Sequence, residues 1–445
     1  MNSLSDLIID EETVDTATAS RELPELGLIE QQWETDPVPP AELADKSAKA
    51  VRTLDFSEIP LGGEIAVGVG SRGIANLSEI VSGVIAELDD QGYAPFVVPA
   101  MGSHGGATAA GQREVLETLD ITEAEIGCEI RATMNVVEVG RTPKRDVPVF
   151  TDAHAAEADG ILPVNRVKPH TDYDGSIESG LAKMLVIGFG KQRGAKTAHD
   201  WAIDWSLREM VPDIAARLVD TLPVIGGVAI LEDQRDDTAE IECVPATSIL
   251  EREQTLLARA EELLPRLPFE ELDLLVVDRP GKNVSGQGID PNVIGRRPFA
   301  INEPEPDIPS IKRIYVRSLT DDTHGNAMGV GSADYIHQDI LRNIEATDTF
   351  VNAITASTIR GIRIPPVLES DRAAIRASLS SIGASASRDV RMMRVTDTMR
   401  LETVYASPPL IDQARERDDL HVLADPSPID FDRNGDVRAK SPDIH

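Results

Sequence analysis

The pattern that most restricts the fold is a repeated alternation of short apolar runs, glycine-bearing loops and amphipathic stretches, which begins at Glu64. The apolar runs 64–70 and 94–100 have the length of buried strands, and the stretches 74–92 and 109–119 carry apolar residues at helical spacing. Strands that alternate with helices form a parallel sheet with helices packed on its faces. The sequence therefore predicts an α/β fold.

The alternation continues in the second half of the chain, and 445 residues are enough for two or three hydrophobic cores. A charged amphipathic helix is expected over 247–267, and Pro268 follows it, which indicates a linker. We therefore predict two α/β domains with parallel-type sheets, 1–268 and 269–445, with the active site in the cleft between them. Within the first domain, residues 1 to about 50 are acidic and proline-rich, and we expect them to be irregular.

The net charge of the chain limits the partners that it can bind and indicates the habitat of its source. The formal net charge is −33, and by count only 10 of the 43 basic residues are lysine. So acidic a surface repels nucleic acid and anionic membranes, so neither is an expected partner. Acidic residues that are spread along the chain, with few lysines, are typical of a halophilic protein, because molar salt screens the repulsion between the negative charges. The N-terminus lacks the features of a signal peptide and no apolar window is long enough to span a bilayer, so we expect a cytoplasmic protein.

Chemically reactive side chains follow the predicted strands, at the edge of a parallel sheet where ligands bind. These residues are Arg72, His104, His170 and Lys282. The glycine-rich loop around His104, with Ser103 and Gly105, can bring backbone N–H groups close to an anionic ligand such as a phosphate. A single histidine is usually structural, but several reactive groups at successive strand ends favour a functional site.

A second signal is the segment Val164–Asp200, which holds four of the ten lysines and two of the eight histidines. Lys183 lies in a stretch expected to be an apolar helix, where an ammonium is costly unless it is neutralised, paired or modified. His199 lies 16 residues later, at the expected start of the next helix. There are two competing interpretations: the segment is a basic surface loop, or Lys183 extends from its helix to the surface.

The chain resembles the lactate racemase family at four positions, which are Lys183, His199 and the two earlier histidines, His104 and His170. The cofactor of this family is a nickel-pincer nucleotide. This cofactor is a pyridinium-3,5-bisthiocarboxylic acid mononucleotide that holds nickel. In the family a lysine is joined to the cofactor as a thioamide, and a histidine 16 residues later binds the nickel. The resemblance implies that Lys183 carries the cofactor covalently and that His199 is the nickel ligand.

The resemblance extends to other positions between about 60 and 300. It implies that His104 and His170 are the acid/base groups, and that Lys282 binds the substrate carboxylate. It also implies that Arg72, with Ser103 and Gly105, contacts anionic groups of the cofactor, and that Arg72 contacts the substrate as well. The run 69–73 (VGSRG) lacks the acid and the proline of the family motif, which predicts a different substrate pocket.

The implied function is an isomerase that racemises or epimerises a 2-hydroxy acid by transient hydride transfer, with cofactor-synthesis enzymes as partners. Two alternatives stay open. One is a metal-free α/β enzyme that uses a nucleotide or phosphate, and the other is a non-catalytic protein that binds nickel or a nucleotide. The sequence also leaves open which 2-hydroxy acid is the substrate, whether the chain forms a homo-oligomer, and whether His324 and Asn326 are functional or structural.

Overall fold

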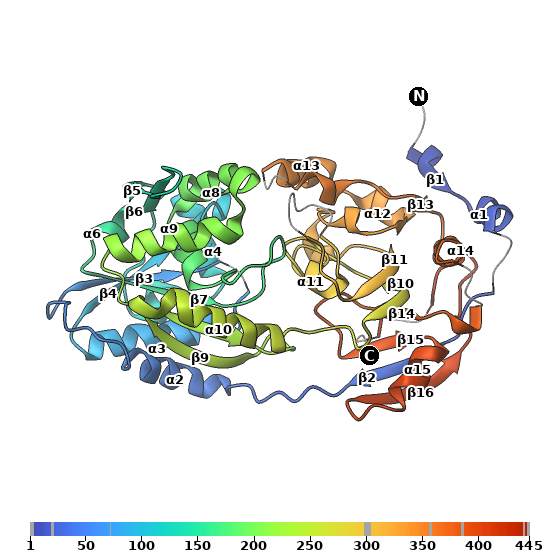
Figure 1. The fold of residues 1–445 in the computed structure, drawn as a ribbon, viewed down its shortest axis with the longest axis horizontal. Coiled ribbons are helices and arrows are strands. Elements are labelled where there is room, and N and C mark those ends of the chain that lie inside the picture. Colours follow the sequence, from blue (N-terminus) through green and yellow to red (C-terminus); the bar gives the residue numbers. More distant parts are fainter. Residues whose placement is uncertain are drawn as a thin grey trace. The chain divides into compact units, whose positions relative to one another are not determined.

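The computed structural model describes residues 4–18, 22–71, 73–297, 304–355, 358–383, 387–438 and 441–442. The chain forms two compact units (Figure 1). The first unit is Thr35–Leu264, and the second unit combines Met1–Glu34 with Pro265–His445. Each contains a largely parallel sheet with helices, so the predicted α/β class is confirmed.

The first unit is built on a five-stranded sheet in the order β4-β3-β7-β8-β9. All neighbouring pairs are parallel except β8 and β9, which form an antiparallel edge. A separate antiparallel hairpin pairs β5 with β6. The strands are β3 (Glu64–Val69), β4 (Ala94–Pro99), β5 (Val136–Arg141), β6 (Pro148–Asp152), β7 (Gly160–Arg166), β8 (Gly226–Glu232) and β9 (Thr238–Pro245).

Helices cover both faces of this sheet because its central strands are apolar on both sides. Ile65 and Val67 of β3 pack with α2 and α3, whereas Ala66 between them faces the core formed with α7 to α10. Buried side chains on both faces are typical of parallel sheets. The helices are α2 (Leu43–Val51), α3 (Leu77–Asp90), α4 (Ala109–Glu117), α5 (Glu123–Ile126), α6 (Ala153–Glu157), α7 (Leu181–Lys183), α8 (Lys191–Trp205), α9 (Leu207–Thr221) and α10 (Ile249–Glu262).

The second unit contains a nine-stranded sheet in the order β1-β13-β12-β11-β10-β14-β15-β2-β16. Its strands are β1 (Ile8–Ile9), β2 (Leu26–Gln31), β10 (Glu271–Val277), β11 (Ser310–Val316), β12 (Tyr335–His337), β13 (Val367–Leu368), β14 (Met392–Val395), β15 (Thr403–Ala406) and β16 (Leu420–Ser427). The strands from β1 to β14 in this order are parallel, and the remaining three pair antiparallel. Across the sheet, the strands from β13 to β10 run backwards in sequence order, and β14 follows β10 on its other side, so the strand order reverses between β10 and β14.

Helices also cover the second sheet. The cores on its two faces contain residues of α14 with α1, and of α11, α12 and α15. The helices are α1 (Glu11–Thr18), α11 (Pro291–Ile294), α12 (Gln338–Asn343), α13 (Ala346–Thr355), α14 (Asp371–Ser380) and α15 (Pro408–Ala414). Throughout the described residues, the helices are too short or too polar to cross a bilayer.

The N-terminal segment differs from the prediction in both structure and placement. Residues 1–50 were expected to be an irregular part of the first domain, but they contain β2 and α2. Strand β2 lies between β15 and β16, with Leu28 opposite Tyr405, so Met1–Glu34 belongs to the second unit. The boundary after α10 falls at Leu264, a few residues before the predicted 268.

The acidity of the chain leads to a prediction about stability. A net charge of −33 is self-repulsive, and salt screens this repulsion. The midpoint of thermal unfolding is expected to fall steadily as KCl is lowered from molar to millimolar concentration, as followed by circular dichroism. A midpoint that does not change with KCl would contradict the halophilic interpretation.

Candidate functional site

The carboxyl edge of the first sheet brings several predicted residues to one place. Val69 at the end of β3 pairs with Pro99 of β4 and with Val164 of β7, so the three strands end at a similar level. The loops that follow them contain Ser71, His104 and His170. Loops at the carboxyl ends of adjacent parallel strands are where α/β proteins bind ligands.

His104 lies half-buried in the loop after β4 and is held by the loop after β3. Its Nδ1 forms a hydrogen bond with the hydroxyl of Ser71, which leaves Nε2 as the other reactive atom of the ring. Gly105 and Gly106 have φ values of 65° and 62°, which a side chain would strain. Ser103 is exposed, and its carbonyl accepts a hydrogen bond from the backbone N–H of Ala107. The loop is therefore a tight glycine-dependent turn.

The His104 loop contacts the segment that carries Lys183. The backbone N–H of Gly102 donates to the carbonyl of Gly188 at 3.1 Å. On β3, a Cβ at Gly68 would lie 2.2 Å from the ring of Phe189, so glycine is required for this approach. These contacts pack the loop after β4 and the strand β3 against the turn that follows Lys183.

His170 lies half-buried in the loop after β7, which is fixed by the buried carboxylate of Glu178. This carboxylate accepts hydrogen bonds from the backbone N–H groups of His170 and Gly175. Nδ1 of His170 accepts a hydrogen bond of 3.0 Å from the backbone N–H of Asp172. A neutral His170 therefore carries its proton on Nε2, and the ring packs against Tyr173 with 4.7 Å between centroids.

Lys183 and His199 interact electrostatically. Burial lowers the pKa of His199, the charge of Lys183 lowers it further, and Asp172 and Asp200 oppose the shift. A lowered pKa keeps the imidazole neutral near pH 7, which is the form that binds a metal. The backbone N–H of Asp172 also contacts His170, so Asp172 links His170 to the electrostatic cluster of Lys183 and His199.

The local structure around this pair differs from the prediction. Lys183 is half-buried and ends the short helix α7, and residues Met184–Gly188 continue as a π-helix. The expected single apolar helix is therefore two short pieces, and π-turns of this kind occur often at functional sites. His199 lies in the middle of α8, which begins at Lys191, and not at the start of a helix as expected.

Glu253 is a residue of this region that the sequence reasoning missed. It lies on α10 and accepts a hydrogen bond of 2.9 Å from the backbone N–H of Ala182, at the start of the helix that ends in Lys183. A Cβ at Gly180 would lie 2.2 Å from Oε1 of Glu253. Burial raises the pKa of Glu253 to about 7, although its backbone hydrogen bonds oppose the shift. The sequence signal was an acid within the apolar stripe of α10, four residues after Ile249.

Glu253 leads to a pH prediction. Because its folded pKa is about 7 and its ordinary value is 4.5, its contribution to stability is fully present below about pH 4.5 and is lost as the pH rises through 7. The loss is about 3 kcal/mol at about 1.4 kcal/mol per pKa unit. Glu253→Gln keeps an acceptor for Ala182, so denaturant unfolding at pH 8 should show a more stable protein than wild type. The exposed Glu251→Gln is the control, and an equal pH dependence in Glu253→Gln and wild type would contradict the prediction.

The remaining predicted residues are not brought into this cluster by the described contacts. Arg72 lies outside the described residues. Lys282 belongs to the second unit, where its Nζ donates to Oδ1 of Asn352 on α13 at 2.5 Å. His324 is exposed with a φ of 48°, and Oδ1 of Asn326 accepts the backbone N–H of Met328 at 3.1 Å. The local contacts of His324 and Asn326 favour the structural interpretation.

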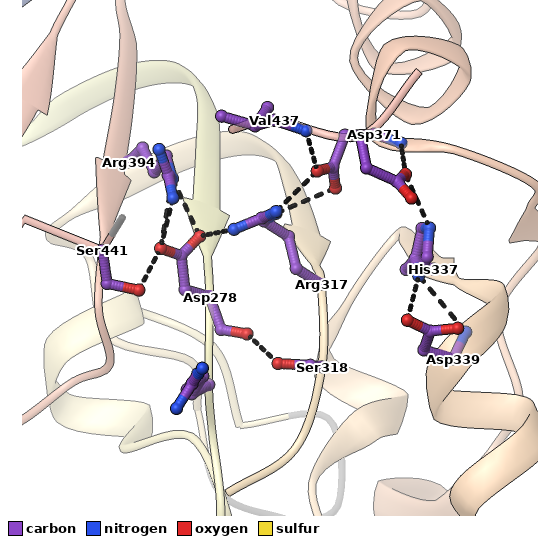
Figure 2. Close-up of a pocket in the computed structure, with 11 residues that line it drawn as sticks. Asp278, Arg317, Ser318, His337, Asp339, Asp371, Arg394, Val437 and Ser441 are labelled. Atoms are coloured by element: carbon purple, nitrogen blue, oxygen red, sulfur yellow. Dashed lines mark hydrogen bonds and ion pairs between the residues drawn. The ribbon is translucent and has the colours of Figure 1, made fainter. Parts of the chain in front are cut away.

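The second unit contains a polar cavity of about 420 Å³ beyond the carboxyl ends of its parallel strands (Figure 2). Its wall contains a chain of buried ion pairs in which Asp278 lies between Arg394, at 2.8 Å, and Arg317, at 3.0 Å. Arg317 in turn pairs with Asp371 at 2.6 Å. Burial opposes ionisation of Asp371, but the hydrogen bonds and charge of Arg317 outweigh it and lower the pKa of Asp371. The groups satisfy one another, which indicates a structural network.

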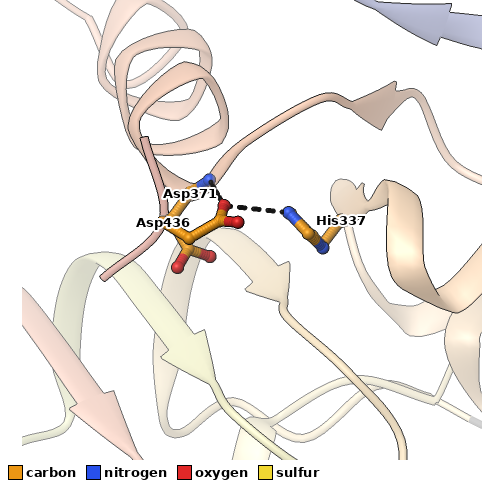
Figure 3. A group of neighbouring side chains, drawn as sticks. All are labelled: His337, Asp371 and Asp436. Carbon is orange, nitrogen blue, oxygen red and sulfur yellow. Dashed lines mark hydrogen bonds and ion pairs between the residues drawn. The ribbon is translucent and has the colours of Figure 1, made fainter. Parts of the chain in front are cut away.

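Three residues at this cavity, His337, Asp371 and Asp436, have ligand atoms within 4.8 Å of one another (Figure 3). The hydrogen bonds argue against a metal there. Oδ1 of Asp371 accepts from Tyr315 and Arg317, and Oδ2 accepts from Arg317 and the backbone of Val437. Both oxygens are saturated, since each has two lone pairs. Asp436 instead bonds to His337 at 3.1 Å, which ties the C-terminal segment to the sheet.

Comparison with known proteins gives a distant similarity. No protein-family model matches the sequence, and no curated protein matches it. Among solved structures, the chain is similar to the lactate racemase apoprotein from Thermoanaerobacterium thermosaccharolyticum. The identity is 10%, the TM-score is 0.43, and the alignment covers 77% of this chain and 88% of that chain. A likeness this distant carries no argument about the activity of this chain.

Proposed function

We propose that the protein is a nickel-pincer nucleotide-dependent isomerase that racemises or epimerises a 2-hydroxy acid. The observation that carries the proposal is that the charge of Lys183 acts on His199, a half-buried imidazole whose pKa is lowered mainly by burial. These are the two residues that the sequence resemblance assigns to the cofactor. The same cluster includes His170, and the loop with His104 is hydrogen-bonded to the turn that follows Lys183.

The chemistry of the donor set fits the cofactor. Lys183 offers a half-buried primary amine, and conversion to an amide-like linkage removes a charge that is costly to bury. His199 offers a neutral imidazole, which suits nickel. The turn with Ser103 and Gly105 and the expected cation of Arg72 suit its anionic groups. When bound, the cofactor would supply the hydride acceptor for C2 of the substrate.

The two histidines would handle the proton of the substrate hydroxyl. Nδ1 of His104 contacts the Ser71 hydroxyl, and when Nδ1–H donates to Ser71 the lone pair of Nε2 is available as a base. Neutral His170 presents Nε2–H and so enters as a hydrogen-bond donor. Inversion of a stereocentre needs a base for each enantiomer. His170 would act as the base for the other enantiomer once its proton has moved to Nδ1 and the hydrogen bond from Asp172 has been given up, which leaves the lone pair of Nε2 available. Lys282 and Arg72 would bind the substrate carboxylate.

A chiral screen tests the proposal. The full chain is made together with the cofactor-synthesis enzymes and incubated with single enantiomers of lactate, malate, 2-hydroxyglutarate, sugar acids and aryl-lactates. We expect one class to lose optical purity, and no change with protein made without those enzymes. Nickel-loaded protein that inverts no member of the panel would contradict the proposal and favour a non-catalytic nickel or nucleotide carrier.

A further inference from the structure

A fully buried lysine lies behind the His104 loop and has no role in the function proposed above. Lys191 is 0% exposed and begins α8, the helix that carries His199. Its φ is 53°, a left-handed conformation that is strained for a residue with a side chain. A buried charge and a strained backbone are both costly, and such features persist where the surrounding structure requires them.

The ammonium of Lys191 contacts three buried acceptors. It forms an ion pair with the equally buried Asp152 at 3.1 Å and a hydrogen bond with Oε1 of Gln112 at 3.1 Å. It also donates to the carbonyl of Pro99, the last residue of β4. The lysine therefore joins the end of β4, the end of β6 and the helix α4 to the start of α8.

Gln112 continues this network to the His104 loop. It is 0% exposed, and its Nε2 donates to the carbonyl of Gly102 at 2.9 Å and to the carbonyl of His104 at 3.4 Å. The two segments are pressed together, since a Cβ at Gly111 would lie 2.1 Å from the carbonyl oxygen of Gly105. The side chain of Gln112 accepts from Lys191 and donates to the loop, so it transmits the position of one to the other.

We infer that Lys191 and Gln112 are positioning residues that fix the position of His104 relative to α8, the helix that carries His199. The network itself is independent of the reaction, and its catalytic importance rests on the function proposed above. A displacement of His104 of about 1 Å is expected to lower the rate of the chemical step by up to about 100-fold with little effect on substrate binding.

Gln112→Glu isolates the link, because a carboxylate still accepts from Lys191 but cannot donate to the carbonyls of Gly102 and His104. Gln112→Leu removes both contacts. Lys191→Met combined with Asp152→Asn removes the ammonium without leaving a buried unpaired carboxylate. Ser47→Ala is the control, since it also removes a buried hydrogen bond of the first unit, from Ser47 to the carbonyl of Leu43.

The first readout is the NMR signals of the histidine rings in full-length protein made without the cofactor-synthesis enzymes. The His104 signals and their pH titration should shift in Gln112→Glu and Gln112→Leu, whereas those of exposed His421 should not. Ser47→Ala should leave the His104 signals unchanged. His104 signals that stay at their wild-type positions in both Gln112 variants, or that move equally in Ser47→Ala, would overturn the inference. If the double variant Lys191→Met with Asp152→Asn fails to fold, the two Gln112 variants still test whether the network positions His104.

The second readout is kinetic and separates this inference from the proposed function. In loaded protein, Gln112→Glu should lower kcat about 10- to 100-fold while KM changes less than about threefold. If the His104 signals shift but wild-type protein racemises nothing, the positioning role stands and the proposed function falls. If wild type racemises and Gln112→Glu keeps its full kcat, the positioning role falls and the proposed function stands.

Discussion

Lys183→Arg is expected to abolish racemisation and to leave the protein without bound cofactor. An arginine keeps the positive charge and most of the length of the side chain, but a guanidinium does not replace a primary amine in an amide-like linkage. Lys183 is half-buried at the end of α7. Intact mass and peptide mapping of wild-type protein made with the cofactor-synthesis enzymes should find added mass on the peptide with Lys183, and the variant should show none.

The matched control is Lys196→Arg, on the next helix along the chain. Lys196 is exposed and pairs with Asp200 at 2.6 Å, so its replacement should keep the adduct, the nickel and the activity. Wild-type protein made without the cofactor-synthesis enzymes should have the mass of the bare chain. Active, nickel-containing protein with an unmodified Lys183 would refute the assignment.

Replacement of the three histidines should separate metal binding from proton transfer. His199→Ala is expected to lose nickel and activity together, because it removes the neutral imidazole that is proposed to bind the metal. His104→Ala and His170→Ala should keep nickel and the adduct but lose about 10²- to 10⁴-fold in racemisation, the usual effect of a missing acid/base group. Nickel is measured on the purified variants by elemental analysis, and racemisation by chiral chromatography.

Each of the acid/base variants retains one histidine, so it should still exchange hydride on one face of the substrate. A product that is oxidised but not inverted would support that division of roles. His421→Ala, at an exposed position of the second unit, serves as the control and should behave as wild type. Loss of nickel from His170→Ala together with its retention in His199→Ala would mean that the two roles are reversed.

Local patterns were enough to predict much of the first unit. Strands β3, β4 and β7 are short apolar runs, and helix α3 has regular apolar spacing, so each can be recognised from neighbouring residues alone. The placement of His104 and His170 after strand ends follows from the same patterns. The parallel order of the strands then places their loops at one edge.

Features that depend on distant partners could not be predicted in the same way. Strand β2 is stabilised by β15, with Leu28 opposite Tyr405, and nothing near β2 in the sequence identifies this partner. The start of α7 is capped at Ala182 by Glu253, which comes from another helix far along the chain. The ion pair of Asp278 with Arg394 likewise joins residues far apart in the chain.

The central claim is that hydrogen leaves and returns to C2 of a 2-hydroxy acid as hydride, and the fate of that hydrogen tests it most directly. Loaded protein is incubated in ordinary water with a single enantiomer of its best substrate from the chiral screen, labelled with deuterium at C2. The account predicts that the inverted product retains the deuterium, as measured by mass spectrometry and NMR, because hydride does not mix with solvent protons. Inversion with loss of the deuterium to water would indicate proton abstraction and would contradict the account.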